Sequence, residues 1–209
     1  MGIVLLLLAL AAPARADVEP RVESARLARA DGQLVADITL ADLLTPPVEN
    51  TLKSGLPVVV DLAMELRPAS GASTGRVLRS TLTYDVWEDS YRLERDTRAW
   101  DLPDLAGLLT ACTHLEAEPV AALAALPPGP LTLRLRVAVD PLGGVERERM
   151  VRWLARTVSD PSDPGARELR LDLGALIGSV FSKKGDDAGW GPELVQGPFR
   201  VAELPEVAP

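Results

Sequence analysis

The residues of this chain best suited to chemistry are a lone cysteine and a lone histidine two positions apart, Cys112 and His114. A zinc site needs three or four such ligands, and no carboxylates stand at a recognisable spacing to complete one. A cysteine nucleophile needs a base within hydrogen-bond reach, which His114 supplies only in a favourable local geometry. We therefore interpret Cys112 as a core residue and His114 as incidental, and we expect no catalytic residue, cofactor or metal.

A second candidate is a group of carboxylates beside two aromatic residues. The group comprises Asp85, Glu88, Asp89, Glu94 and Asp96, with Trp87 and Tyr91 among them. Paired carboxylates do acid–base work when one is desolvated and the other is not. Here they surround a predicted turn and alternate with arginines, which favours solvated or ion-paired side chains. A polar hairpin end is our interpretation, and a glycan or ester hydrolase is the alternative.

Aromatic residues are scarce, so each of the four tryptophans is considered as a core or an interface residue. A tryptophan dominates either a core contact or an interface. Trp87, Tyr91 and Trp190 are our candidate interaction residues. Trp190 stands out because the loop that holds it, between Lys183 and Gly191, gives little reason to bury it.

The elements that would position these residues are mostly strands, because apolar and polar residues alternate at period two in several segments. The clearest are residues 58–67 and 131–140, and weaker strands are predicted over 22–28, 34–40, 78–86, 91–93 and 169–173. Asp31-Gly32 is a turn signal between two of them. Seven short strands separated by turn residues predict a mainly β fold, an antiparallel two-sheet β-sandwich of the immunoglobulin-like class.

Two or three short helices are expected in the connections. Thr45 with Pro46 or Pro47 opens one that ends at Gly55, and Pro103 to Cys112 forms another. The stretch Val145–Val158 fits both helix and strand, and we favour helix. No composition shift separates two domains, so residues 17–202 are predicted to form one domain, with a frayed tail over 203–209.

The first sixteen residues have the pattern of a secretory signal peptide. An apolar run from Ile3 to Ala12 precedes Pro13 and the small-x-small sequence Ala14-Arg15-Ala16. The run is about half of the roughly twenty residues that span a bilayer, so we expect cleavage after Ala16 rather than an anchor. The mature protein is therefore expected in the periplasm or otherwise exported, soluble and without a membrane span.

The net charge and the spread of the basic residues argue against two classes of binding partner, and the cysteine count bears on how the fold is stabilised. Removal of residues 1–16 leaves 193 residues with 21 basic and 30 acidic side chains, a net charge of −9. Nucleic acids and anionic lipid surfaces select clustered Lys and Arg, whereas the basic residues here are dispersed. A single cysteine allows no internal disulfide, so stability must come from packing.

Three runs of this sequence resemble the bacterial envelope family described as domain of unknown function 4390 (DUF4390). They are residues 51–58 (TLKSGLPV), 82–85 (LTYD) and 87–93 (WEDSYRL). The likeness covers residues 20–140, departs from the family pattern at Pro68 to Gly75, and does not extend to the last 60 residues. It implies a signal peptide but no activity and no catalytic residues. Because some members are encoded near membrane sensor kinases, it also implies such a kinase as a candidate partner.

These features predict a noncatalytic periplasmic or cell-envelope module that binds another envelope protein. The alternatives are an envelope hydrolase that uses the carboxylates between Asp85 and Asp96, and a structural subunit of an envelope assembly. A cleft lined by those carboxylates would favour the hydrolase. A flat, apolar, exposed strand edge would favour the interaction module, and self-association would favour the structural subunit.

The signal-peptide interpretation predicts that protein recovered from the envelope or periplasmic fraction begins at Asp17. Cleavage after Ala16 produces that end because the small side chains at positions 14 and 16 fit the recognition pattern. N-terminal sequencing of the fractionated protein reads it directly. An intact Met1 on protein found in the cytosol would contradict export.

Overall fold

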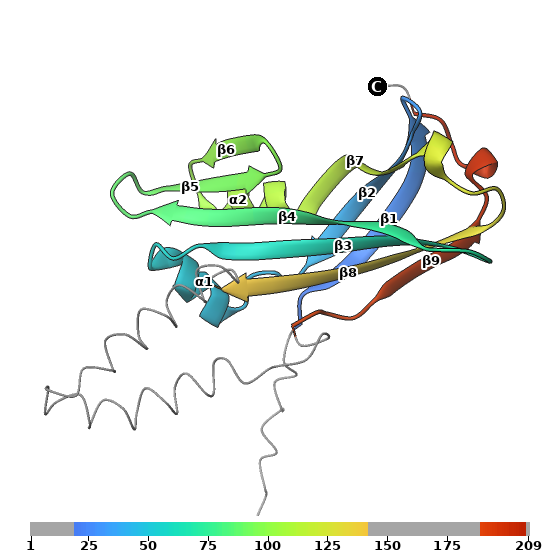
Figure 1. The fold of residues 1–209 in the computed structure, drawn as a ribbon. Coiled ribbons are helices and arrows are strands. Elements are labelled where there is room, and N and C mark those ends of the chain that lie inside the picture. The colour runs from blue at the N-terminus through green and yellow to red at the C-terminus, as the bar shows by residue number, and fades with distance from the viewer. Residues whose placement is uncertain (1–18, 142–188, 208–209) are drawn as a thin grey trace, which may run out of the picture.

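The computed structural model describes residues 19–141 and 189–207, which form a two-sheet antiparallel β-sandwich (Figure 1). The strands are β1 (Arg21–Ala30), β2 (Gln33–Ala41), β3 (Val58–Pro68), β4 (Thr74–Asp85), β5 (Ser90–Arg95), β6 (Arg98–Leu102), β7 (His114–Ala122), β8 (Leu131–Pro141) and β9 (Leu194–Phe199). The helices are α1 (Pro46–Lys53) and α2 (Leu105–Thr113), with 3-10 turns at Leu123–Ala125 and Val201–Glu203. In the described part of the chain, no helix is long and apolar enough to cross a membrane.

Hairpins build most of both sheets. The smaller sheet has the order β1-β2-β7, and the larger has the order β6-β5-β4-β3-β8-β9. Strands β3 to β6 follow one another as a meander, whereas β7 joins β2, and β8 joins β3, across longer connections. Figure 1 shows the long β3, β4 and β8 running side by side, with β1 and β2 crossing behind them.

The core lies between the sheets and is built from the alternating residues of β3 and β8. Every second β3 residue from Val58 to Leu66 is buried, as are Leu133, Leu135 and Val137 of β8. These residues belong to one apolar cluster with Leu34 and Ile38 of the smaller sheet. The period-two prediction for both long strands is therefore confirmed.

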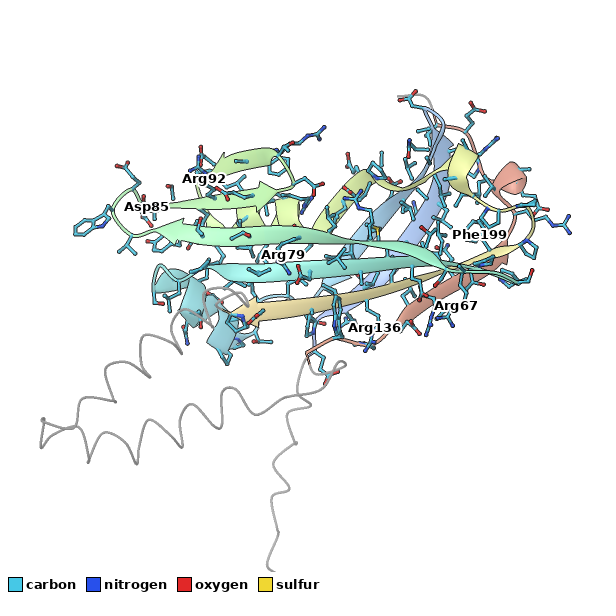
Figure 2. All side chains as sticks on the ribbon, viewed as in Figure 1. Arg67, Arg79, Asp85, Arg92, Arg136 and Phe199 are labelled. Atoms are coloured by element: carbon cyan, nitrogen blue, oxygen red, sulfur yellow. The ribbon has the colours of Figure 1, made fainter. Side chains whose placement is uncertain are left out.

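The other face of the larger sheet carries cross-strand ion pairs (Figure 2). Arg79 of β4 donates from Nε and Nη2 to the two carboxylate oxygens of Asp61 on β3, both at 2.8 Å. Arg134 of β8 lies 3.5 Å from Glu65 and 2.6 Å from Glu193. Exposed pairs of this kind add little stability, but they keep this face polar and so fix which side of the sheet is buried.

The two helices predicted within the described residues and the turn at Asp31-Gly32 are confirmed. Pro46 and Pro47 occupy the first turn of α1, although the Thr45 side chain makes no capping hydrogen bond. Asp104 caps α2 by accepting from the Gly107 N–H at 2.7 Å. Asp31 and Gly32 both have positive φ, at 48° and 72°, as a tight hairpin turn between β1 and β2 requires.

Three strands, β6, β7 and β9, were not predicted from the sequence. β6 buries no side chain, so it has no apolar alternation. β7 buries Leu115 and Val120, five positions apart, because its register shifts near Ala117, whose φ is +48°. β9 contains Gly197-Pro198, which is normally a break but is tolerated on a sheet edge.

The expected frayed tail is wrong for residues 203–207, which contact β1. The Arg29 N–H donates to the Pro205 carbonyl at 2.8 Å, and the Val207 N–H donates to the Arg29 carbonyl at 2.9 Å. Arg29 Nε also donates to the Leu204 carbonyl at 3.1 Å. These backbone partners hold the segment in place, which its composition does not reveal.

The residues before β9 also reach the start of β1. The Gly191 N–H donates to the Val137 carbonyl at 2.8 Å, and a Cβ at Gly191 would collide with the carbonyl oxygen of Pro20. Gln196 donates to the Ala25 carbonyl at 3.1 Å. The C-terminal segment therefore contacts both sheets, and glycine is required at position 191 for this close approach.

Several predictions fall outside the described residues. These are the signal peptide over 1–16, the strand over 169–173 and the helix over Val145–Val158.

The central position of Leu62 predicts a large stability difference between two matched substitutions. Leu62 is buried between Leu78 and Val137 on the neighbouring strands, so Leu62→Ala should cost about 3 to 5 kcal/mol of unfolding free energy. Val77→Ala, at a β4 position that is 54% exposed, should change it by less than about 0.5 kcal/mol. Urea denaturation followed by tryptophan fluorescence measures both. Equal effects would contradict the inward assignment of the β3 stripe.

Candidate functional site

The turn between β4 and β5 is organised by the carboxylate of Asp85. Its Oδ1 accepts the N–H groups of Trp87 at 2.8 Å and of Glu88 at 3.1 Å. This is the local hydrogen bonding that makes aspartate a turn residue. On the far side of the turn, the Tyr84 hydroxyl donates to Asp89 at 2.7 Å, and this hydrogen bond raises the pKa of Tyr84. The turn is therefore held from both ends.

The base of the turn is fixed by an aromatic pair. Tyr84 and Tyr91 face each other across β4 and β5, with ring centroids 4.7 Å apart. Immediately below them Leu82 pairs with Leu93, and both leucines are buried in the core. The turn therefore continues directly from these packed cross-strand pairs of β4 and β5.

Trp87 stands fully exposed on this ordered turn. Its side chain is 96% exposed, and the adjacent Val86 is 57% exposed. Leu56, which follows α1, is 38% exposed, and Gly55 beside it lies against Val86. We call Leu56, Val86 and Trp87 the apolar tip. The sequence singled out Trp87, but not Leu56 or Val86, because neither belongs to a pattern that indicates exposure.

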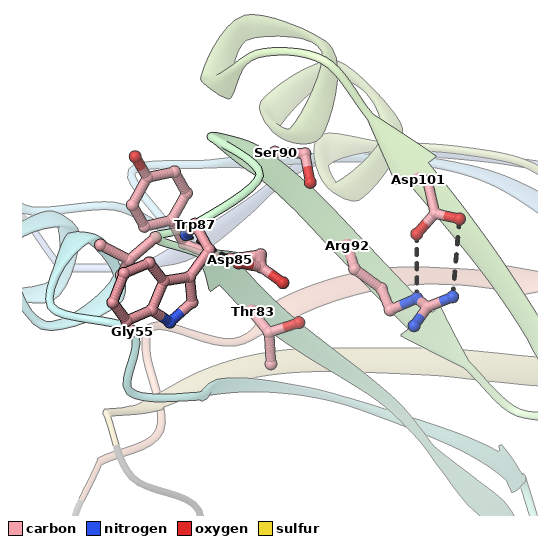
Figure 3. A pocket seen from close by; sticks show the side chains of 9 residues that line it. Gly55, Thr83, Asp85, Trp87, Ser90, Arg92 and Asp101 are labelled. Atoms are coloured by element: carbon pink, nitrogen blue, oxygen red, sulfur yellow. Dashed lines mark hydrogen bonds and ion pairs between the residues drawn. The ribbon is translucent and has the colours of Figure 1, made fainter.

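A recess of about 380 Å³ opens beside the apolar tip (Figure 3). It is lined by Gly55, Thr83, Tyr84, Asp85, Val86, Trp87, Ser90, Arg92 and Asp101. Arg92 and Asp101 form an ion pair on its far side, with Nε 3.0 Å from Oδ1. Figure 3 shows the Asp85 carboxylate lying between the Trp87 indole and this ion pair. The recess therefore combines an aromatic surface, a carboxylate and two hydroxyl groups.

The carboxylates proposed for a hydrolase are not gathered around this recess. Asp85, Glu88 and Asp89 lie at one end of β5 and Asp96 at the other, and a strand of that length separates them by roughly 20 Å. Asp96 instead pairs with Arg76 at 3.3 Å. Asp85 and Asp89 are also engaged in the hydrogen bonds that hold the turn, so the carboxylates from Asp85 to Asp96 do not form one acid–base cluster.

The burial of Tyr91 and Trp190 does not fit the interaction role for which the sequence made them candidates. Tyr91 is only 8% exposed, because its ring packs against Tyr84 and the core. Trp190 is partly buried, since its backbone bridges to Ala138 of β8 instead of lying in an open loop. Of the three residues, only Trp87 offers its side chain to a partner.

Cys112 and His114 do not share a strand face. Cys112 lies near the end of α2 in the core, whereas His114 begins β7 and is exposed, with Nδ1 2.9 Å from the Thr113 hydroxyl. Burial raises the pKa of the Cys112 thiol to about 11. Among the described residues, no group of three His, Cys, Asp or Glu side chains could hold a metal ion.

A second recess, between β5, β6 and β7, holds a network of arginines. Arg76 contacts Asp96, Glu118 at 3.2 Å and the Pro119 carbonyl at 2.9 Å. Burial raises the pKa of Glu118, and the positive charge of Arg76 opposes that rise. These groups engage one another across the two sheets, which is a structural role.

Arg95 lines the same recess and is held from several directions. It donates to the Ser80 hydroxyl at 2.9 Å and to the Ala111 carbonyl at 3.1 Å. Its guanidinium also lies 5.9 Å from the centre of the Trp100 ring, within the range of a cation–π contact. Trp100 therefore already has a cationic partner, whereas Trp87 has none among the described residues.

The burial of Cys112 predicts very slow thiol labelling of the folded protein. Against an ordinary value of 9.0, a pKa of about 11 lowers the thiolate fraction at pH 8 by about 100-fold, and exclusion of the reagent slows reaction further. Labelling of native and urea-unfolded protein with a chromogenic disulfide reagent measures the ratio. A native rate within tenfold of the unfolded rate would show that the thiol is accessible.

Comparison with known proteins places the chain in a family without an assigned role. No curated protein and no solved structure matches it. The sequence pattern described as domain of unknown function (DUF4390) matches residues 18–142, which include β1 to β8 and the turn that carries Trp87. The chain therefore belongs to the DUF4390 family.

Proposed function

We propose that this protein is a noncatalytic interaction module of the cell envelope, and that it contacts a protein partner through the apolar tip. The observation that carries the proposal is Trp87, whose indole is 96% exposed although the turn beneath it is hydrogen-bonded at both ends. Tryptophans of this kind are typical of interface hot spots.

The physical gain from covering Trp87 is large. A tryptophan side chain buries 150–250 Å² when covered, which corresponds to roughly 4 to 6 kcal/mol of hydrophobic free energy before the costs of association. Because Asp85 and the Tyr84–Asp89 hydrogen bond already hold the turn, little conformational entropy is lost on binding. The tip is thus preorganised for a partner.

The sequence supports the proposed location and partner class. The signal-like residues 1–16 and the acidic balance support an extracytoplasmic protein that binds another envelope protein rather than nucleic acid. The separation of Asp96 from Asp85, Glu88 and Asp89 by the length of β5 supports a binding role over hydrolysis.

Site-specific photocrosslinking in cells of the native host tests this function. A photoreactive phenylalanine analogue replaces Glu88, the exposed neighbour of Trp87, in chains that carry either Trp87 or Trp87→Ala. We expect a discrete protein adduct that falls at least about tenfold in the Trp87→Ala background, as loss of a hot-spot residue implies. Mass spectrometry of the adduct identifies the partner.

Val195→Ala is the matched control, since Val195 is exposed on β9, in a different part of the larger sheet. It should leave the adduct unchanged. An adduct that persists without Trp87 would place the interface elsewhere. If the probe at position 88 gives no protein adduct, the tip is not a protein contact, and an adduct with a second copy of the chain would favour the structural-subunit alternative.

A further inference from the structure

We propose that the recess beside Trp87 binds a lysine or arginine side chain of the partner polypeptide. This inference rests on the proposed function and specifies the chemistry that the tip recognises. It follows from the shape of the recess, its charges and the aromatic surface at its mouth.

The recess has the dimensions and lining for one long side chain. Its volume is about 380 Å³, and its walls are part apolar and part polar. Trp87 and Val86 form the apolar wall, against which the methylene groups of a lysine or arginine would pack. Thr83 and Ser90 add hydroxyl acceptors deeper in the recess.

The charge in and around the recess is negative. Arg92 is neutralised by Asp101 through the 3.0 Å ion pair, which leaves Asp85 as the carboxylate without an arginine partner in the recess. Asp85 accepts both of its hydrogen bonds within the turn at Oδ1, so Oδ2 lies outside them. Glu88 and Asp89 on the same turn increase the attraction for a cation.

Trp87 supplies the second half of the recognition. A guanidinium or ammonium group over an indole face is attracted by the negative charge density of the ring, more strongly as the site is desolvated. A contact of this kind exists in the described part of the chain, between Arg95 and Trp100. An incoming cation would lie between the open face of Trp87 and the Asp85 carboxylate, which are adjacent in Figure 3.

Other occupants fit the recess less well. An anionic group would meet Asp85 and find Arg92 already engaged by Asp101. An anionic lipid surface would be repelled by the carboxylates of the turn. A purely apolar side chain would cover Trp87 but would desolvate the charge of Asp85 without supplying a cation to neutralise it.

Titration of the mature protein with four defined peptides tests the proposal. The peptides are acetyl-Gly-X-Gly-amide, in which X is arginine, lysine, norleucine or glutamate. The readout is the indole N–H resonance of Trp87 in ¹⁵N-labelled protein, assigned by its absence from Trp87→Phe. We expect the arginine and lysine peptides to shift it with roughly millimolar affinity, as a single side-chain contact allows. The norleucine and glutamate peptides should not shift it.

Charge-removing variants locate the attraction. Asp85→Asn keeps an oxygen acceptor for the turn and should weaken the arginine peptide about fivefold, the effect of losing about 1 kcal/mol of charge attraction. Glu88→Gln, which leaves the Asp85 hydrogen bonds intact, should weaken it in the same direction but less. Glu116→Gln, an exposed change on β7 away from the turn, is the matched control and should leave affinity unchanged.

Three outcomes would overturn the inference. They are norleucine binding as well as lysine, Asp85→Asn and Glu88→Gln both leaving the affinity unchanged, and a Trp87 shift produced by phosphatidylglycerol vesicles but by no peptide. If the peptides fail while the crosslink from position 88 still requires Trp87, only the cationic recognition is wrong. If the crosslink also fails, the proposed function is wrong.

Discussion

Burial of every second residue of β3 is the constraint on which the rest of the structure depends. β3 lies inside the larger sheet, with β4 on one side and β8 on the other, so its inward row from Val58 to Leu66 sets the register of both neighbours. A slip of one residue would turn this row to water and bring Asp61 and Glu65 into the core. The ion pairs of Asp61 and Glu65 with arginines of β4 and β8 oppose the same slip from the outer face.

The turn of the candidate site is held in place by the pairing of β3, β4 and β5. The register of β4 against β3 places Leu82 opposite Val58, and the register of β5 against β4 then stacks Leu93, Tyr91 and the turn in order. Each layer rests on a buried one, so the backbone of the turn that carries Trp87 is held in place. Binding residues held in this way lose little freedom when a partner arrives, which is why a loop tip on a sheet is an effective recognition element.

Strands in which every second residue is buried were predictable from the sequence, because burial produces a regular alternation of apolar and polar residues. β3 and β8 alternate cleanly because one face is fully covered, and α1 and α2 carry recognisable start and stop residues. β6, β7 and β9 escaped prediction because an exposed edge, a register shift or an internal proline erases the alternation. β7 and β9 pair with strands that are distant in the sequence, and β6 pairs with the short strand β5, whose alternation is weak.

Site residues could be anticipated from the sequence only as far as residue type marks them. Residue type alone marked Trp87 as a candidate, but exposure separates it from Tyr91 and Trp190, and exposure depends on tertiary neighbours. The carboxylates between Asp85 and Asp96 look like one cluster in the sequence because they are close in number. A strand advances about 3.3 Å per residue, so β5 separates Asp96 from the carboxylates of the turn.

The pairing of the C-terminal segment with β1 and β8 also governs when the molecule can be completed. β9 and residues 204–207 supply partners to Ala25, Arg29 and the outer edge of β8, and they are the last part of the described chain to leave the ribosome. Until they emerge, that edge has unpaired backbone groups and the sandwich is open along one side. Pairing of this edge therefore waits for β9, and a nascent chain stalled before β9 would present an unpaired strand edge that other chains or a chaperone could bind.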